Sequence, residues 1–266
     1  MKTYNFLPEG WEKNNFAGTN DIGQGIVERC DENYNLHVKL DSGVEGIIPR
    51  KEVEVFNLDE NGFPKTNLCV GKVNKYVQFK IKEKDGENII LSRKEAQEEV
   101  LDFVKNDLQE GQVINGIVKN ITPYGAFVDI GGGIVGLVHI EDLSVARIKT
   151  PYERIKIGQK VNIMVKSIDR SKGRISLSYK EQYGSWEENA EKYTVGMKTQ
   201  GIVRETEKNK NGIFIELTPN LVGMTEYKEG LNYGEKVDVS IKKIDYNKKK
   251  VKLVILKWIK LNYVYY

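Results

Sequence analysis

The sequence predicts an all-β protein with three consecutive small barrels joined by two short helices. One pattern of glycines and β-branched residues occurs three times along the 266 residues. Each copy contains five short runs of strand-forming residues, separated by turn residues. The two segments between the copies are acidic and show helical spacing of apolar residues. A repeat of about 70 residues is long enough to fold around a core of its own.

The repeat is clearest at two glycine-containing motifs. The first motif begins the first strand of each copy, and the second lies in the third strand. The matching segments are Gly25-Ile26-Val27, Gly116-Ile117-Val118 and Gly201-Ile202-Val203 for the first motif, and Gly46-Ile47-Ile48-Pro49, Gly136-Leu137-Val138-His139 and Gly223-Met224-Thr225-Glu226 for the second.

The middle copy defines the strands best. Turns are predicted at Thr122-Pro123, Gly131-Gly132-Gly133 and Ser171-Lys172-Gly173. The strands between them are Val113–Ile121, Ala126–Ile130, Ile134–His139, Val161–Ile168 and Arg174–Ser178. Five strands with a longer excursion between the third and the fourth are typical of a closed OB-fold barrel. The Gly131–Gly133 run lacks the Lys-Ser/Thr and the helix of a phosphate loop, so we interpret it as a turn.

Two linkers separate the barrels. Residues 93–108 place Ala96, Val100, Val104 and Leu108 at helical spacing. Residues 181–193 form the second predicted helix, with Ser185 as N-cap and Glu188 three residues later. We expect Trp186 to seal the joint between this helix and a barrel. The predicted organisation is a first repeat (1–92), a linker (93–110), a second repeat (111–180), a linker (181–195), a third repeat (196–257) and an aromatic tail (258–266).

The charge is unevenly distributed along the chain. Residues 111–180 and 196–260 each carry a net charge of +6, whereas residues 1–94 carry −1 and both linkers are acidic. A polyanionic partner of the second and third repeats would explain this distribution, although a solvated basic surface would also produce it.

The sequence from Gly111 to Lys180 resembles the RNA-binding repeat of ribosomal protein S-one, an OB-fold module also found in exoribonucleases and translation factors. The resemblance rests on YGAFVDI (124–130), GLVHI (136–140) and IDRSKGRISLS (168–178). The whole chain, from Phe6-Leu7-Pro8 onwards, is similar to a three-repeat form of this family from Gram-positive anaerobic bacteria. The resemblance implies RNA binding, with the small ribosomal subunit as a possible partner.

The family's RNA-contact positions fall on five residues of the middle repeat: Tyr124, Phe127, His139, Asp169 and Arg174. Their chemistry suits a single strand, because bases stack on aromatic rings and an arginine can contact a phosphate. Structural alternatives remain for three of them. Phe127 could lie in the core, His139 could be structural, and Asp169 could serve only its turn.

The other two repeats depart from this pattern. The third keeps Phe214 and Asp245 and has Lys250 in place of Arg174, but Asn211 and Glu226 replace Tyr124 and His139. We therefore expect Phe214 and Lys250 to support weaker, mainly electrostatic RNA contact. The first repeat keeps Tyr34, but His37 and Pro49 replace Phe127 and His139. We expect this repeat to be a docking or structural module.

The sequence contains no catalytic or metal-binding constellation. The two histidines lie in different repeats, and no CxxC, HExxH or Walker motif is present. We expect no enzymatic activity, no cofactor and no small-molecule substrate. Cys30 and Cys69 are expected to be free thiols, and no signal peptide or membrane span is predicted.

The prediction is a cytoplasmic protein of translation or RNA metabolism that binds single-stranded RNA or mRNA, mainly through the middle repeat. The competing hypothesis is a protein-interaction scaffold that docks on the ribosome or on an RNA-processing enzyme. DNA regulation is least supported, because no recognition helix is visible. The tail could extend the last strand, seal the third barrel or mediate self-association.

Overall fold

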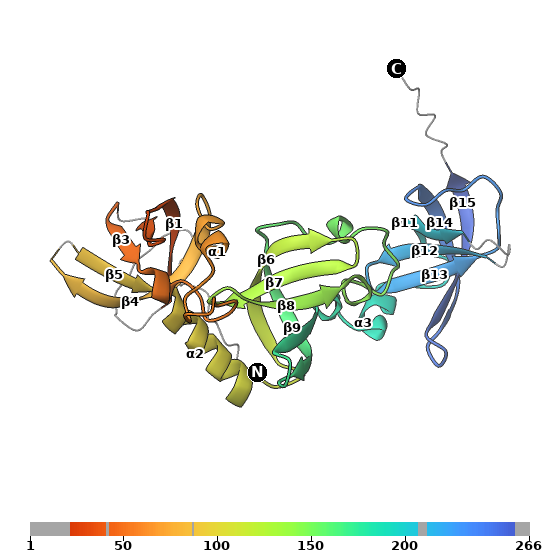
Figure 1. Cartoon of the computed structure of the whole chain (residues 1–266). Helices are drawn as coiled ribbons and strands as arrows, with labels where there is room; N and C mark the ends of the chain where they lie inside the picture. Colours follow the sequence, from red (N-terminus) through yellow and green to blue (C-terminus); the bar gives the residue numbers. More distant parts are fainter. Residues whose placement is uncertain (1–21, 41–42, 87, 207–211, 259–266) are drawn as a thin grey trace, which may run out of the picture. The chain divides into compact units, whose positions relative to one another are not determined.

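The protein is described by a computed structural model covering residues 22–40, 43–86, 88–206 and 212–258. Each repeat forms a closed five-stranded barrel (Figure 1). The predicted all-β fold of three consecutive OB-type barrels is therefore confirmed. The predictions for Asn211 and for residues 259–266 of the tail concern positions outside the described residues, as does the start of the resemblance at Phe6.

The strands agree closely with the predicted segments. The first barrel comprises β1 (Gly23–Cys30), β2 (Leu36–Lys39), β3 (Glu45–Ile48), β4 (Tyr76–Asp85) and β5 (Asn88–Ser92). The middle barrel comprises β6 (Val113–Thr122), β7 (Gly125–Gly131), β8 (Ile134–His139), β9 (Lys160–Asp169) and β10 (Arg174–Ser178). The third comprises β11 (Lys198–Thr206), β12 (Ile213–Thr218), β13 (Leu221–Thr225), β14 (Lys236–Asp245) and β15 (Lys250–Trp258).

All three barrels share one strand order. The first three strands are consecutive neighbours, the third lies beside the fifth, and the fourth closes the barrel between the fifth and the first. The third and fifth strands pair in parallel, as at Ile47–Ile90 and Gly223–Val251. The parallel pair requires a crossover, which the excursion between the third and fourth strands provides.

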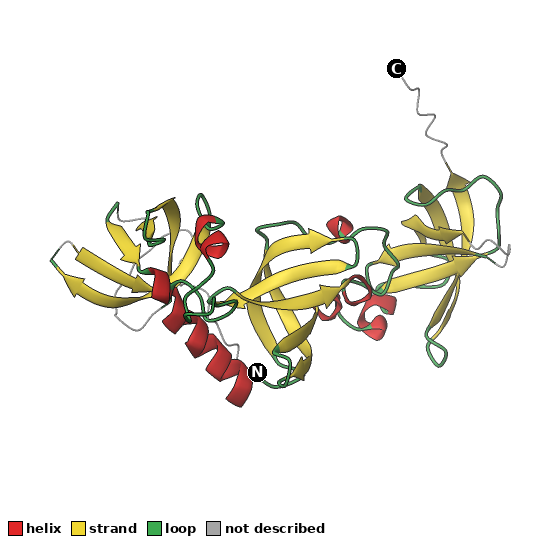
Figure 2. Ribbon diagram, viewed as in Figure 1, coloured by secondary structure: helices red, strands yellow, loops and turns green. Residues whose placement is uncertain are grey.

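In the part of the chain that the structure describes, the helices lie in the excursions and linkers (Figure 2). They are α1 (Thr66–Val70), α2 (Arg93–Asn106), α3 (Trp186–Ala190) and the 3-10 helices η1 (Arg50–Glu52), η2 (Ile140–Asp142), η3 (Pro151–Glu153) and η4 (Lys180–Tyr183). The first linker is a helix as predicted, and Ser92 caps α2 by accepting a hydrogen bond from the Glu95 amide.

The second linker differs from the predicted single helix over 181–193. Gly184 has a φ of 78°, a left-handed conformation that ends η4 before α3 begins. Ser185 and Glu188 form the predicted capping box at the start of α3. Trp186 packs against the core of the third barrel and lies edge-on to Tyr246, with ring centroids 5.6 Å apart, as expected for a residue that seals this joint.

The recurring glycines allow close strand packing. A Cβ on Gly25, Gly116 or Gly201 would lie 2.6, 2.4 or 2.3 Å from a side chain of the second strand. A Cβ on the glycine of each third strand would lie 2.5–2.6 Å from a leucine of the fifth strand. Because any larger residue would collide at these points, the two glycine motifs follow from the small size of the barrels.

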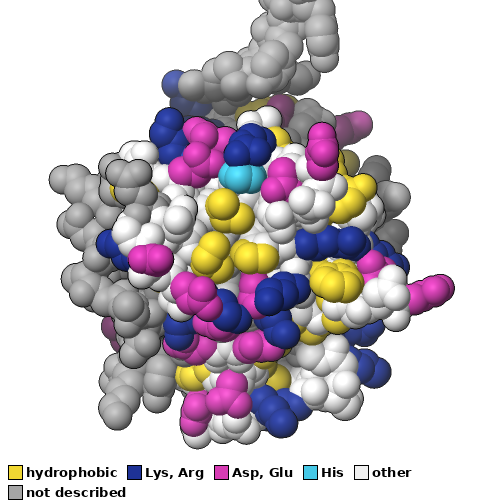
Figure 3. Space-filling view, turned by 60° about the vertical axis from the view of Figure 1, so that its left-hand side comes forward, with side chains coloured by type: hydrophobic (Ala, Val, Ile, Leu, Met, Phe, Trp, Pro, Cys, Tyr) yellow, Lys and Arg dark blue, Asp and Glu magenta, His cyan; other side chains and the backbone are white. Residues whose placement is uncertain are grey.

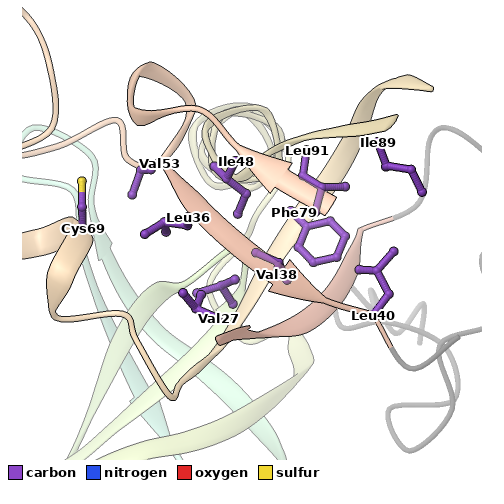
Figure 4. Close-up of a cluster of buried hydrophobic side chains, with 11 residues drawn as sticks. Val27, Leu36, Val38, Leu40, Ile48, Val53, Cys69, Phe79, Ile89 and Leu91 are labelled. Atoms are coloured by element: carbon purple, nitrogen blue, oxygen red, sulfur yellow. The ribbon is translucent and has the colours of Figure 1, made fainter. Parts of the chain in front are cut away.

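Each barrel encloses its own apolar core. In the first barrel, Phe79 lies beside Val38 and Leu91 and is fully buried (Figure 4). Cys69 of α1 joins this core, and Cys30 packs against it as a second free thiol. The third barrel buries Val203, Ile215 and Leu253 in the same manner.

The chain divides into two compact units, and both include strands of the middle barrel. One unit consists of residues 1–120, 127–137 and 157–177, and the other of residues 121–126, 138–156 and 178–266.

Candidate nucleic-acid interface

Tyr124 and His139 lie at the same edge of the second unit. Tyr124 occupies the turn between β6 and β7 and is 51% exposed. The backbone amide of Ile140 donates to the Tyr124 carbonyl oxygen over 2.9 Å, which fastens the end of β8 to this turn. His139 is the last residue of β8 and is exposed. Both exposed residues therefore lie at this edge, where the end of β8 is bonded to the turn.

Phe127 lies on β7 in the other unit. Its neighbours Ala126 and Val128 are buried, with exposed fractions of 0% and 1%. Successive side chains of a strand point to opposite faces, and Phe127 is only half-buried. Its ring therefore lies on the outer face of the barrel, while Val128 takes the core position.

Asp169 closes the turn between β9 and β10. Its Oδ1 atom accepts hydrogen bonds from the Ser171 amide (3.1 Å), the Ser171 hydroxyl (2.6 Å) and the Lys172 amide (3.1 Å). The Ser171 hydroxyl, both amides and the charge of Arg174 hold the pKa of Asp169 below its ordinary value. Arg174 begins β10 and is exposed. These hydrogen bonds give Asp169 a structural role in the turn.

The predicted residues form two groups. Tyr124 and His139 belong to one unit, and Phe127, Asp169 and Arg174 belong to the other. In the strand order of the middle barrel, β7, β8 and β10 are consecutive neighbours. These strands contain Phe127, His139 and Arg174 respectively.

The third barrel has a different outer surface. Phe214 of β12 is half-buried and lies opposite Met224 of β13, which in turn lies beside Lys252 of β15. Lys250, the counterpart of Arg174, lies opposite Asp245 in the register of β14 and β15. The register therefore places Lys252, rather than Lys250, in line with the aromatic residue.

In the first barrel the protein itself covers the counterpart of Tyr124. The guanidinium carbon of Arg50 lies 5.2 Å from the ring centroid of Tyr34 and 5.4 Å from that of Phe63. Arg50 is held there by hydrogen bonds to the Pro64 carbonyl and the Asp59 carboxylate. Tyr34 also packs against the core.

The surface of the side that carries the first barrel is mixed in sign. In Figure 3, acidic and basic side chains are interspersed around small groups of hydrophobic ones. His37, the counterpart of Phe127, is buried and lies within 3.3 Å of Asp31 and 2.8 Å of Glu45. Arg29 also lies 2.8 Å from His37 Nδ1, so this buried ring is surrounded by charged neighbours of both signs and does not offer a face for a base.

An ion pair that was not predicted from the sequence joins the first two strands of every repeat. It joins Glu28 to Lys39 over 3.3 Å and Lys119 to Asp129 over 3.6 Å, and the third copy is Arg204–Glu216. The sequence could have indicated these ion pairs, because the two matching positions carry opposite charges in each of the three repeats. Only the third pair is buried on both sides, with side chains 5% and 7% exposed.

The described residues contain neither a metal-binding cluster nor a helix that could span a membrane. No group of three or more His, Cys, Asp or Glu side chains in them is arranged to hold a metal ion. None of the helices in the described part of the chain is long and apolar enough to cross a membrane.

Comparison with known proteins identifies the middle repeat. Residues 107–180 match the family described as S1 RNA binding domain. The chain is 32% identical over 271 residues to small ribosomal subunit protein bS1 of Rhizobium meliloti, covering 88% of this chain and 47% of that protein. It is also 32% identical over 256 residues to bS1 of Staphylococcus aureus, covering 86% of this chain and 63% of that protein.

The chain thus spans about half to two thirds of the length of these curated relatives. A similar match to bS1 of Leuconostoc lactis covers 55% of that protein. The similarity extends beyond the middle repeat, because it covers 86–88% of this chain. Three OB-type barrels, the S1 domain match in the middle one and the similarity to bS1 over most of this chain support an S1-like family.

Proposed function

We propose that this protein binds single-stranded RNA through its middle repeat and acts in translation or RNA metabolism, in the cytoplasm, in association with mRNA or the ribosome. The observation that carries the proposal is the exposed ring of Tyr124, at the same edge as the exposed His139 and within the segment that matches the S1 RNA binding domain. The net charge of +6 over residues 111–180 also suits a polyanion.

In this proposal, Tyr124 and Phe127 stack on bases, His139 adds a third ring, and Arg174 contacts a phosphate. Asp169 positions the turn before Arg174 and is the least direct of the five contributors. The outer surface of the third barrel adds a weaker contact through Phe214 and Lys250, next to which Lys252 supplies another cation. No step of this function requires catalysis or a cofactor.

Fluorescence anisotropy with a labelled single-stranded RNA of about 15 nucleotides tests the proposal. Each base–ring stack contributes about 1–3 kcal/mol, so we expect Tyr124→Ala to weaken binding by roughly 5- to 150-fold. Phe127→Leu should also weaken it, because the substitution removes the ring and keeps apolar contact on β7. Affinity should fall with salt, with a log–log slope of about −0.7 for each phosphate neutralised.

Tyr76→Ala is the matched control, because Tyr76 lies on the first barrel and is 56% exposed. It should leave the affinity unchanged. Circular dichroism verifies that each variant is folded. If folded Tyr124→Ala and Phe127→Leu both bind as tightly as the wild type, stacking on the middle barrel is wrong.

A protein-binding role is the second candidate, and the first repeat favours it. Its excursion between β3 and β4 exposes Phe56, Leu58, Phe63 and Val70 by 41–54%. Apolar side chains gathered on one surface segment are typical of protein contacts. Co-purification with ribosomes that survives nuclease treatment, and that is lost in Phe56→Ser/Phe63→Ser, would support this role.

A further inference from the structure

The excursion of the middle repeat binds the third barrel through a buried ionic cluster. Within the second unit, Arg154 donates to the Glu216 carboxylate over 2.6 Å. Arg204 of β11 donates to the same carboxylate and also to Glu153 of η3. Glu153 and Arg154 come from the excursion, and Arg204 and Glu216 from the barrel. We call these four residues the joint cluster.

The joint cluster is electrically balanced and largely removed from water. The side chains of Arg154, Arg204 and Glu216 are 5–7% exposed, and that of Glu153 is 23% exposed. Two arginines face two glutamates, so no charge lacks a counter-charge. A buried charge without a partner would be strongly destabilising, which ties the position of each member to the other three.

Tyr233 completes the cluster from the third barrel. Its hydroxyl donates to Glu153 over 2.7 Å and accepts from Arg204 over 3.1 Å. Burial raises the pKa of Glu153, but the Tyr233 hydroxyl, the Lys149 amide and Arg204 outweigh it and leave this pKa below its ordinary value. Glu153 is therefore negatively charged at neutral pH, as the pairing with Arg204 requires.

A second set of bonds holds the same joint at the turn between β12 and β13. The Asn220 amide nitrogen donates to the carbonyl oxygens of Lys180 (2.7 Å) and Gly184 (2.8 Å), and its Oδ1 accepts from the Val145 amide (3.2 Å). The Ala146 amide donates to the Pro219 carbonyl over 2.9 Å. Asn220 is 5% exposed, and all its side-chain polar atoms are used.

These contacts define one geometry for the joint. Hydrogen bonds and buried ion pairs depend on direction, and a small rotation at the joint would break several of them at once. The joint also connects the two repeats that carry a net positive charge of +6 each over residues 111–180 and 196–260.

We propose that the joint cluster makes the second and third repeats one rigid RNA-binding unit, in which one single strand contacts both repeats. The inference rests on the proposed RNA binding and adds a role for residues that do not touch RNA. Glu153, Arg154, Arg204 and Glu216 are positioning residues in this scheme.

A rigid joint strengthens the binding of a long strand without adding a contact. Once a strand is bound to the middle repeat, the third repeat is already in place, so its contacts cost no further ordering of the protein. A strand too short to leave the middle repeat gains nothing from the joint. The ratio of the affinities for long and short RNA therefore measures the contribution of the joint.

The experiment compares labelled oligouridine RNAs of about 6 and about 24 nucleotides, because one OB fold occupies roughly 4–16 nucleotides. Wild type, Arg154→Met and Glu216→Gln are measured as full chains. We expect the long-to-short affinity ratio to fall at least about tenfold in both variants, with the affinity for the short RNA unchanged. Glu205→Gln is the matched control, because it removes the exposed pair of Glu205 with Arg147 at the same joint.

A second measurement needs no RNA. In ¹⁵N relaxation, the second and third barrels of the wild type should tumble with one correlation time and those of Arg154→Met with two. If Arg154→Met does not fold, Asn220→Ala replaces it, since it removes three hydrogen bonds from the joint.

The outcomes separate the inference from the proposed function. If neither RNA binds the wild type, RNA binding is wrong, whereas the relaxation data still test the rigid joint. If both RNAs bind and the affinity ratio of folded joint variants equals that of the wild type, the joint has no role in RNA binding and the inference is overturned. Separate tumbling of the two barrels in the wild type would overturn it as well.

Discussion

Arg170 lies between predicted RNA contacts in the sequence, but its side chain binds a helix. Its guanidinium donates to the carbonyl oxygens of Lys105 (3.0 Å) and Leu108 (2.8 Å), at the C-terminal end of α2. The last carbonyls of a helix have no partner within it, and a cation near them is favourable. Arg170 therefore connects the β9–β10 turn to α2.

Replacing Arg170 by alanine should loosen the end of α2. We expect a loss of about 1 kcal/mol in the free energy of unfolding, because two hydrogen bonds to backbone carbonyls at a partly exposed site are removed. Hydrogen exchange of the last-turn amides of α2 should become faster. Lys172→Ala, at an exposed position in the same turn, should change neither quantity. Unchanged exchange in Arg170→Ala would contradict the capping role.

The sequence predicted the position of some residues better than their partners. The turn predicted at Thr122-Pro123 is present, and Tyr124, which follows it, is exposed. The sequence left open whether Phe127 or Val128 points into the core, and the burial of Ala126 and Val128 shows that Phe127 lies outside. The contact of Arg50 with Tyr34 was not predictable, because Phe63 and Asp59, which complete it, lie in an excursion without a repeated pattern.

At the level of elements, the Gly131–Gly133 turn is where α2 meets the middle barrel. A Cβ on Gly132 would lie 2.7 Å from the Ala96 carbonyl oxygen, and a Cβ on Gly133 would lie 2.3 Å from the Arg93 guanidinium. Arg93 also donates to the Gly132 carbonyl over 2.9 Å. The sequence identified this run as a turn, but the reason for successive glycines is the helix that packs on it.

Gly132→Ala and Gly173→Ala form a matched pair that isolates this packing. Their φ angles are +60° and +59°, so both substitutions cost about 1–2 kcal/mol for the left-handed conformation. Only the Gly132 methyl group meets backbone atoms, whereas nothing lies within 4 Å of one on Gly173. We expect Gly132→Ala to destabilise the protein by a further 1–3 kcal/mol or so in urea unfolding. Equal losses would mean that α2 can move away from the turn.

In the second linker the predicted helix start is confirmed, but the predicted extent of the helix is wrong. Ser185 and Glu188 were recognised as a helix start, and they form the capping box of α3. The residues before them were nevertheless assigned to the same helix, although Gly184 and Ser185 mark a break. The spacing of α2 was more reliable, because its buried positions Ala96, Val100 and Val104 continue over several turns.

At the level of the whole molecule, internal repetition made the fold predictable. Three copies of one pattern locate strands that a single copy leaves ambiguous. The joints between repeats were not predictable, since they depend on pairs such as Arg154–Glu216, whose members lie 62 residues apart. Both partners look like ordinary surface charges in the sequence. Their burial becomes apparent only when the excursion is placed against the barrel.

Buried carboxylates also predict how the molecule responds to acid. Burial raises the pKa of Glu52, but hydrogen bonds from Lys82 and Ser92 outweigh it and leave the pKa below the ordinary value. Glu153 behaves similarly at the joint of the second and third repeats. A carboxyl whose pKa is lowered in the folded protein binds protons more readily in the unfolded chain. The free energy of unfolding therefore rises with pH between the folded and the unfolded pKa of this carboxyl.

The stabilisation from Glu52 is complete above its unfolded pKa of about 4.3 and is lost as the pH falls through the lower folded value. We therefore expect the free energy of unfolding, from urea titrations followed by circular dichroism, to decrease from about pH 5 downwards. Glu52→Gln should be less stable than the wild type at pH 7, because it removes one of the two carboxylates paired with Lys82 and leaves only Glu95. It should also lose less stability in acid. Glu98→Gln, at an exposed position of α2, should keep the wild-type pH dependence. If Glu52→Gln retains the full acid loss, the destabilisation arises at other carboxylates, with Glu153 the next to replace.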